Sequence, residues 1–142
     1  MLLMDAEISV IDGAIIDLLK DMARDSSNFR SRACLANTDN AVQEMVIVMG
    51  STSYVRPHKH PKNKAESYHL IEGELLVKIF RDDGQLYREI KLNKKSPVYR
   101  LKGGWYHQPV PMSEWVVYHE VYPGPFIKEQ DVMYATWAPE EK

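Results

Sequence analysis

Three histidines and one glutamate stand at spacings that suit a metal centre. His58 and His60 are separated by one residue. On an extended strand, side chains two apart project from the same face, about 7 Å apart along the axis. Glu66 begins a second extended run after the turn-rich residues 61–65, so a hairpin would fold its carboxylate back beside the two imidazoles. His107, the fourth candidate, follows a Gly-Gly-Trp-Tyr run at the start of another apolar stretch.

Neutral imidazoles and one carboxylate form a mixed nitrogen and oxygen donor set. Such a set suits one divalent transition metal, namely Fe, Mn, Ni, Co, Cu or Zn, and it does not suggest a thiolate site. Four protein ligands on a metal that prefers six leave two positions for water or substrate, which is the arrangement that catalysis needs. The alternative is that the histidines are structural and hold no metal.

The predicted ligands also indicate which neighbours would share their cavity. Alternate residues of a barrel strand face the interior, so residues two positions from an inward-facing ligand face inward too. The expected walls and polar contacts of the pocket are therefore Arg56, Tyr68 and Trp105. Glu66 and Tyr68 are the candidates for catalysis, although the sequence does not identify a catalytic residue.

Two further pairs depend on which way their strands face. Arg30 and Arg32 project to the same side of an extended segment. Guanidinium groups bind phosphate or carboxylate through paired hydrogen bonds, so this pair would bind an anionic small-molecule ligand if it faced the pocket, and would otherwise be a surface pair. His119 and Glu120 are adjacent on a later strand, so only one of them can face the cavity.

The candidate ligands carry a family resemblance. The chain resembles the two metal motifs of the cupin superfamily at six positions: His58, His60, Glu66, Gly73, Gly104 and His107. This resemblance implies a small β-barrel that holds a divalent metal through three histidines and a glutamate. The second motif is the less complete, because Lys102 and Pro111 stand where the superfamily usually has proline and asparagine.

A closer resemblance is to the WbuC family of cupin metalloproteins, small bacterial proteins often associated with O-antigen and surface-polysaccharide gene clusters. The open positions on the metal and the apolar barrel around it favour a metal-dependent enzyme, such as an isomerase, epimerase or oxygenase. The implied substrate is a small oxygen-rich metabolite, for example a sugar derivative or nucleotide sugar used in polysaccharide biosynthesis. The alternative is a metal-containing module that binds or senses a small ligand without turnover, because no second general base can be named beside the ligands.

Composition limits the classes of partner. A net charge of −2, with no basic stripe, favours neither DNA nor RNA as a partner. No apolar run approaches the roughly 20 residues of a membrane span, and the start lacks the pattern of a secretory signal. With Cys34 as the single cysteine, the sequence predicts a cytoplasmic protein without an internal disulfide.

The remaining patterns predict an all-β protein with a short N-terminal helix. Asp12 is the expected N-cap of a helix with an apolar stripe of Ile15, Leu18, Leu19 and Met22, and residues 8–10 are an edge strand or arm. Seven or eight short strands separated by Gly and Pro turns, among them residues 42–50 and 86–92, favour a cupin-type double-stranded β-helix, or jelly-roll barrel. We expect a single cupin domain over 1–142, with an N-terminal arm and helix at 1–40, a barrel core at 41–126 and a C-terminal tail at 127–142. Exposed sheet edges favour a homodimer.

Overall fold

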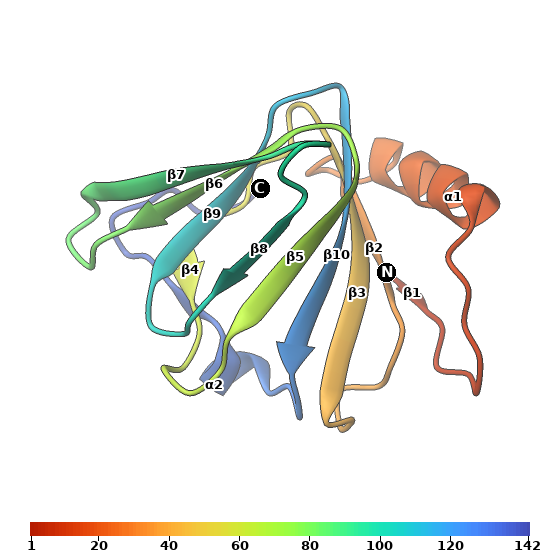
Figure 1. Cartoon of the computed structure of the whole chain (residues 1–142), viewed down its shortest axis with the longest axis horizontal. Coiled ribbons are helices and arrows are strands. Elements are labelled where there is room, and N and C mark those ends of the chain that lie inside the picture. Colours follow the sequence, from red (N-terminus) through yellow and green to blue (C-terminus); the bar gives the residue numbers. More distant parts are fainter.

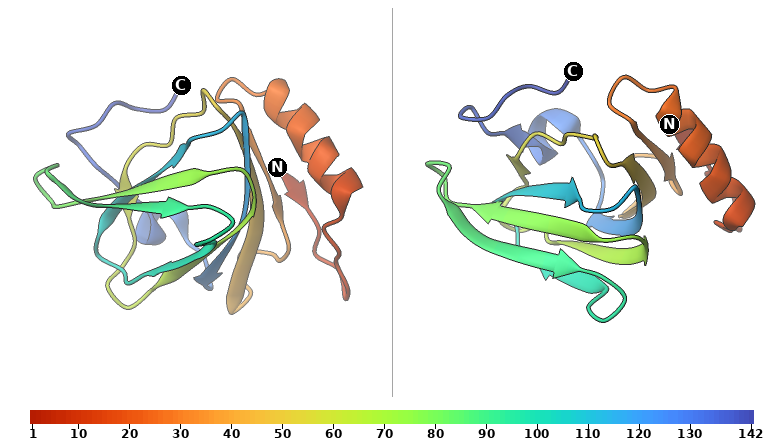
Figure 2. Two further views of the ribbon diagram at one scale, coloured as in Figure 1. Left: turned by 45° about the horizontal axis from the view of Figure 1, so that its top comes forward. Right: turned by 90° about the horizontal axis from the view of Figure 1, so that it is seen from above.

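The strands form two sheets that face each other across a shared core (Figures 1 and 2). The computed structural model describes residues 1–142 and contains eleven strands and two helices. Every pairing between strands is antiparallel except that of β1 with β2. No helix has the length and apolar character that a membrane crossing requires.

The six-stranded sheet has the order β1-β2-β3-β10-β5-β8. Its strands have the bounds β1 Leu2–Leu3, β2 Arg30–Cys34, β3 Val42–Gly50, β10 Trp115–Pro123, β5 Glu66–Glu72 and β8 Val98–Leu101. The five-stranded sheet has the order β11-β4-β9-β6-β7. Its strands have the bounds β11 Met133–Tyr134, β4 His58–Lys59, β9 Tyr106–Pro111, β6 Leu75–Phe80 and β7 Leu86–Leu92.

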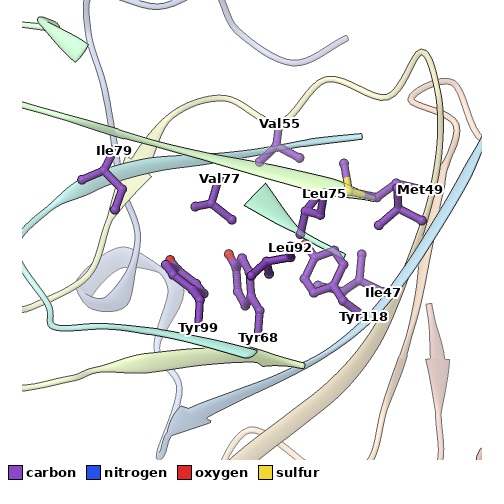
Figure 3. Close-up of a cluster of buried hydrophobic side chains, with 11 residues drawn as sticks. Ile47, Met49, Val55, Tyr68, Leu75, Val77, Ile79, Leu92, Tyr99 and Tyr118 are labelled. Atoms are coloured by element: carbon purple, nitrogen blue, oxygen red, sulfur yellow. The ribbon is translucent and has the colours of Figure 1, made fainter. Parts of the chain in front are cut away.

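Buried side chains from both sheets fill the space between them, because alternate residues of each strand face inward. The five-stranded sheet supplies Val77 and Ile79, and the six-stranded sheet supplies Ile47, Tyr68 and Tyr118. Figure 3 shows these side chains converging from opposite strands. This core fixes the separation of the two sheets and so the position of every ligand candidate carried on them.

Helix α1, Gly13–Arg24, covers the outer face of the six-stranded sheet (Figure 1). The Asp12 side chain accepts a hydrogen bond of 3.0 Å from the Ile15 amide, as an N-cap does. Leu19 is fully buried in a second cluster with outward-facing residues of β2, β3 and β10. Leu18, although part of the predicted stripe, is 44% exposed. The helix therefore supports the sheet from the side away from the ligands.

The strand predictions succeed where the pattern is long and fail where it is short. Strands β3 and β7 have the expected bounds, Val42–Gly50 and Leu86–Leu92. Residues 8–10 form no strand. The N-terminal strand is instead Leu2–Leu3, because these residues pair with β2. Strand β11 and helix α2, Lys128–Asp131, carried no signal because they are too short to show a period.

Strands from all three expected segments of the chain join the sheets. Strands β1 and β2 lie within residues 1–40, and β11 lies within 127–142. The two sheets have free edge strands, β1 and β8 in one and β7 and β11 in the other, and no ladder joins them. The expected closed barrel is therefore corrected to two facing sheets that are not closed into one cylinder.

Candidate metal centre

Three histidine rings meet at one end of the space between the sheets. His58 on β4 lies directly opposite His107 on β9, and their ring centroids are 4.4 Å apart. His60 follows β4, and its ring lies 5.1 Å from that of His107. One nitrogen from each ring lies within 4.8 Å of the others. That separation is short enough for three imidazoles to share one cation.

Backbone carbonyls orient all three rings in the same sense. The Nδ1 atoms of His58, His60 and His107 lie 2.9, 2.7 and 3.0 Å from the carbonyl oxygens of Arg56, Asp131 and Trp105, respectively. A carbonyl can only accept, so each Nδ1 carries a proton, and in the neutral ring each Nε2 keeps its lone pair. Metal-binding histidines are held in this way by partners behind the ring.

Glu66 completes the donor set at the start of β5. Its Oε2 lies 3.2 Å from the Nε2 of His60, and its Oε1 lies 2.7 Å from the Nε2 of His107. The second contact lacks hydrogen-bond geometry, so the fully buried His107 Nε2 has no hydrogen-bond partner. The Tyr99 hydroxyl donates to Glu66 Oε1 at 2.9 Å. A buried lone pair beside a carboxylate, with no proton shared between them, suits a cation that both groups bind.

Local electrostatics keep His58 and Glu66 in the forms that bind metals. Burial, reinforced by the neighbouring rings of His107 and His60, lowers the pKa of His58 to about 3. Burial alone would raise the pKa of Glu66, but the same two rings hold it well below its usual range. Burial opposes the charged form of His60, yet its hydrogen bond to Glu66 and the charge of that carboxylate raise the pKa of His60. A neutral His58 and an ionised Glu66 are ligand forms at neutral pH.

Two close approaches bring the separate motifs together. A Cβ on Gly103 would lie 1.8 Å from the carbonyl oxygen of Pro61, so only glycine lets the loop before β9 pack against the loop after β4. The next amide, that of Gly104, donates to the His60 carbonyl at 2.8 Å. The Gly-Gly pair therefore sets the distance between His60 and His107.

Helix α2 fixes the third ring. The Asp131 carboxylate accepts hydrogen bonds of 2.7 Å from each of Lys64 Nζ, the Tyr122 hydroxyl and the Ile127 amide. This network holds the Asp131 carbonyl against His60, although Asp131 lies 71 residues further along the chain. Sequence reasoning missed Asp131, because the contact belongs to the backbone and leaves no mark in residue type.

A cavity of about 680 Å³ opens beside the centre. His58 and His60 line it, together with four residues expected to contact substrate: Arg30, Arg32, Arg56 and Tyr68. Tyr118 and Glu120 also line the cavity. Of the two adjacent candidates on β10, it is therefore Glu120 that faces the cavity. His119 faces the other side of the sheet, where its Nδ1 lies 3.1 Å from that of His69.

Trp105 does not line this cavity, contrary to the expectation from alternation. Its ring stacks on Tyr87, with centroids 4.8 Å apart. The residue precedes β9 and lies in the loop after Gly104, whose φ of +92° turns the chain, so strand parity does not extend to it. Trp105 serves the centre through its carbonyl, which orients His107.

One family model matches the chain. It is described as "Domain of unknown function (DUF6016)" and covers residues 11–92, more than half of the sequence. That match includes His58, His60 and Glu66, and it ends before His107. No curated protein matches the sequence.

Solved structures share the fold at low sequence identity. CapF, described as a capsular polysaccharide assembling protein from Staphylococcus aureus, has a TM-score of 0.65 at 14% identity and is matched over 77% of this chain. Oxalate oxidase in complex with the substrate analogue glycolate has a TM-score of 0.60 at 15% identity, also over 77%. Bacillus subtilis oxalate decarboxylase, described with Mn(II) centres, has a TM-score of 0.52 at 17% identity over 62%.

These neighbours are cupin jelly-roll proteins, so the predicted fold class is confirmed. The match covers 32% of the CapF chain, 56% of oxalate oxidase and 23% of oxalate decarboxylase. The shared feature is thus the fold of one jelly roll within longer chains.

Proposed function

The chain belongs to the family described as a domain of unknown function (DUF6016), and because that description assigns no activity, we propose a function from the site. We propose that His58, His60, Glu66 and His107 hold one divalent transition metal, and that the protein is an enzyme acting on a small oxygen-rich anion. The observation that carries the proposal is the cluster of three carbonyl-oriented imidazoles, whose ligand nitrogens lie within 4.8 Å of one another, beside a buried carboxylate that contacts two of them.

The donor set fits several ions, because imidazole and carboxylate serve Fe, Mn, Co, Ni, Cu and Zn alike. Mn(II) is described for the oxalate decarboxylase neighbour, which supports testing it first. A bound divalent ion would polarise a carbonyl or hydroxyl oxygen of the substrate and stabilise negative charge that develops there. The protein residues supply orientation and proton transfer around that oxygen.

The residues that line the cavity suit an anionic, hydroxylated substrate. Arg30, Arg32 and Arg56 offer positive charge, and Tyr68 and Tyr118 offer hydroxyl groups. Glu120 has no hydrogen bond from another side chain, and burial, reinforced by the charge of Glu66, raises its pKa to about 8. A carboxyl group with such a pKa suits proton transfer near neutral pH, so Glu120 joins Glu66 and Tyr68 as a catalytic candidate.

We further propose a sugar-derived substrate, such as a nucleotide sugar of surface-polysaccharide biosynthesis. The support is the resemblance of the sequence to the WbuC family, together with the fold shared with CapF. The second candidate is a metal-containing module that binds or senses such a ligand without turnover. It is favoured by the contacts of Glu66 with His60, His107 and Tyr99, which leave that carboxylate little freedom to transfer a proton.

Metal content tests the first part of the proposal. Untagged protein should contain about one equivalent of a transition metal, and His58→Ala should lose most of it, since each removed ligand weakens retention strongly. His69→Ala is the matched control, because that histidine pairs with His119 on the outer face. Metal below about a tenth of an equivalent in wild type, also after incubation with each candidate ion, would refute the proposal.

A substrate panel tests the second part. Metal-loaded protein is offered nucleotide sugars, sugar phosphates and small keto acids, with and without chelator. Turnover that chelator abolishes supports the enzyme. Ligand-dependent thermal stabilisation without any product supports the binding module instead.

A further inference from the structure

A carboxylate from the C-terminal tail already occupies a set of anion-binding donors at the cavity. Glu141 Oε1 accepts from the Arg30 guanidinium at 2.8 Å and from Asn28 Nδ2 at 3.2 Å. Its Oε2 accepts from the Arg56 backbone amide at 3.2 Å. Arg30, Arg56 and Glu141 all line the 680 Å³ cavity, so the three donors bind this carboxylate at the edge of the metal site.

The tail that carries Glu141 is fixed at points before it. The Ala135 carbonyl accepts two hydrogen bonds from the Arg56 guanidinium, at 3.1 and 2.8 Å, and Ala135 is fully buried. The Pro139 carbonyl accepts from the Tyr54 hydroxyl at 2.8 Å. Figure 2 shows the tail passing beside the segment between β3 and β4. Glu141 can therefore leave its donors while the chain up to Pro139 stays in place.

We propose that Asn28 Nδ2, the Arg30 guanidinium and the Arg56 backbone amide form the anion subsite of the metal cavity, and that Glu141 fills it when no ligand is bound. A ligand with a carboxylate or phosphate group displaces Glu141 and takes over the same donors. This inference rests on the proposed function, because it names the charged end of the substrate that the metal would hold at its other end.

The chemistry of the donors defines the ligand class. A guanidinium, an amide NH₂ and a backbone N–H around one carboxylate bind oxyanions, and none of these three groups can accept a hydrogen bond from a cationic ligand. Arg32 lines the same cavity and forms no ion pair in the structure, so it can meet the added charge of a phosphate.

The existing ion pair is suited to displacement. The side chains of Arg30 and Glu141 are 31% and 23% exposed, and ion pairs that water reaches are weak. A carboxylate tethered to the protein nevertheless competes with any free anion. If the tail is closed in about nine of ten molecules, the apparent affinity for an anion is reduced about 10-fold.

Calorimetric titration of the metal-loaded protein tests the inference. Inorganic phosphate and glycolate are the probes, at one ionic strength, against wild type, Glu141→Gln and Glu140→Gln. Glu140 is the matched control, because it lines the same cavity but makes no hydrogen bond or ion pair there. We expect about 10-fold tighter binding of a probe to Glu141→Gln, and no change for Glu140→Gln. Adding Arg30→Gln to Glu141→Gln should abolish the gain.

Each other result has a definite reading. Equal affinities in wild type and both single variants would overturn the inference, as would an equal gain in both variants, which reports only the loss of a negative charge. A gain for phosphate alone or glycolate alone identifies which anion the subsite prefers. Metal analysis of the same samples separates the two proposals: without metal the proposed function fails, whereas one equivalent of metal with unchanged anion binding removes only the subsite.

Discussion

Backbone carbonyls behind the three histidines decide what the rings can bind. Because each Nδ1 donates to a carbonyl, each Nε2 presents a lone pair to the interior. Three lone pairs and one carboxylate repel one another unless a proton or a cation lies among them. Tyr99 lessens that repulsion by donating a hydrogen bond to Glu66.

The Tyr99 hydroxyl should therefore tune metal affinity. In Tyr99→Phe, Glu66 loses its neutral donor while the ring still packs between Tyr68 and its neighbours in the core. Loss of such an outer hydrogen bond typically weakens metal binding about 10- to 100-fold. Chelator competition measures the change, and Tyr118→Phe, which makes no hydrogen bond to Glu66, should bind metal as wild type does.

Glu120 should give the metal-free protein a distinct pH dependence. Its pKa is raised from 4.5 to about 8, chiefly by burial and further by the charge of Glu66. Between these pH values the folded state keeps a proton that the unfolded state has lost, so this group's contribution to stability falls as pH rises. The slope is at most about 1.4 kcal/mol per pH unit, and smaller here because the side chain borders a cavity that admits water.

Urea unfolding in chelator, from pH 5 to pH 8, checks this sign. The stability of Glu120→Gln relative to wild type should increase with pH over that window. Glu114→Gln, at an exposed position before β10, should show a constant difference. A difference that stays flat for Glu120→Gln would contradict the raised pKa.

At the scale of elements, the short helix α2 connects the C-terminal segment to the centre. Its Asp131 carboxylate takes three hydrogen bonds and is 2% exposed, while its carbonyl orients His60. A four-residue helix has little stability of its own, so these contacts hold it. The geometry of one ligand thus depends on tertiary contacts of a segment far away in sequence.

Asp131→Asn should weaken both the fold and the metal site. The amide group of asparagine has only one oxygen that can accept hydrogen bonds, so at least one buried donor loses its partner. That loss costs about 1–3 kcal/mol. We expect a lower free energy of unfolding together with faster loss of metal to a chelator. The control is Glu129→Gln in the same helix at an exposed position, which should change neither. A purely destabilised Asp131→Asn with normal metal retention would show that His60 needs no such support.

At the scale of the whole molecule, metal and fold should be linked. Both sheets would supply ligands to the proposed ion, since Glu66 belongs to the six-stranded sheet while His58 and His107 belong to the other. An ion bound by all of them would favour the folded state, by about 2.7 kcal/mol when the free metal is at 100 times its dissociation constant. No ladder of hydrogen bonds joins the two sheets at this point, so the ion would be a direct connection between them.

Removal of metal should therefore lower the melting temperature by about 5–10 °C for a chain of this size. Calorimetry before and after dialysis against chelator measures the drop, and readdition of the ion should reverse it in proportion to the logarithm of its free concentration. His58→Ala should melt at the same temperature with and without chelator. An unchanged melting temperature of the wild-type protein in chelator would contradict the link between metal and folding.

The homodimer and the division of the chain at residues 40 and 126 stay predictions. Free edges on both sheets are compatible with pairing between copies. Sedimentation at micromolar concentration should give twice the 16.4 kDa mass of the chain if the pairing is stable. The mass of one chain alone would contradict the homodimer.

Local patterns were enough to predict the strands of seven to nine residues, the helix cap and the ligand candidates. Periodicity shows which residues share a face, and the types of side chain on that face show the chemistry available to it. Alternation also indicated the inward direction of Arg56 and Tyr68, because each is two residues from a candidate ligand along an extended chain. It could not choose between His119 and Glu120, since either strand register has the same period.

Tertiary structure alone decided the rest. Trp105 lies outside the cavity because a glycine turn interrupts the alternation of inward and outward side chains before β9. The Asp131 carbonyl and the Glu141 carboxylate reach the site from distant segments of the chain. Such contacts depend on where the chain returns in space, and that is set by the packing of two sheets around one core. Sequence spacing carries information over a few residues, whereas the contacts of Asp131 and Glu141 span between 71 and 113 residues.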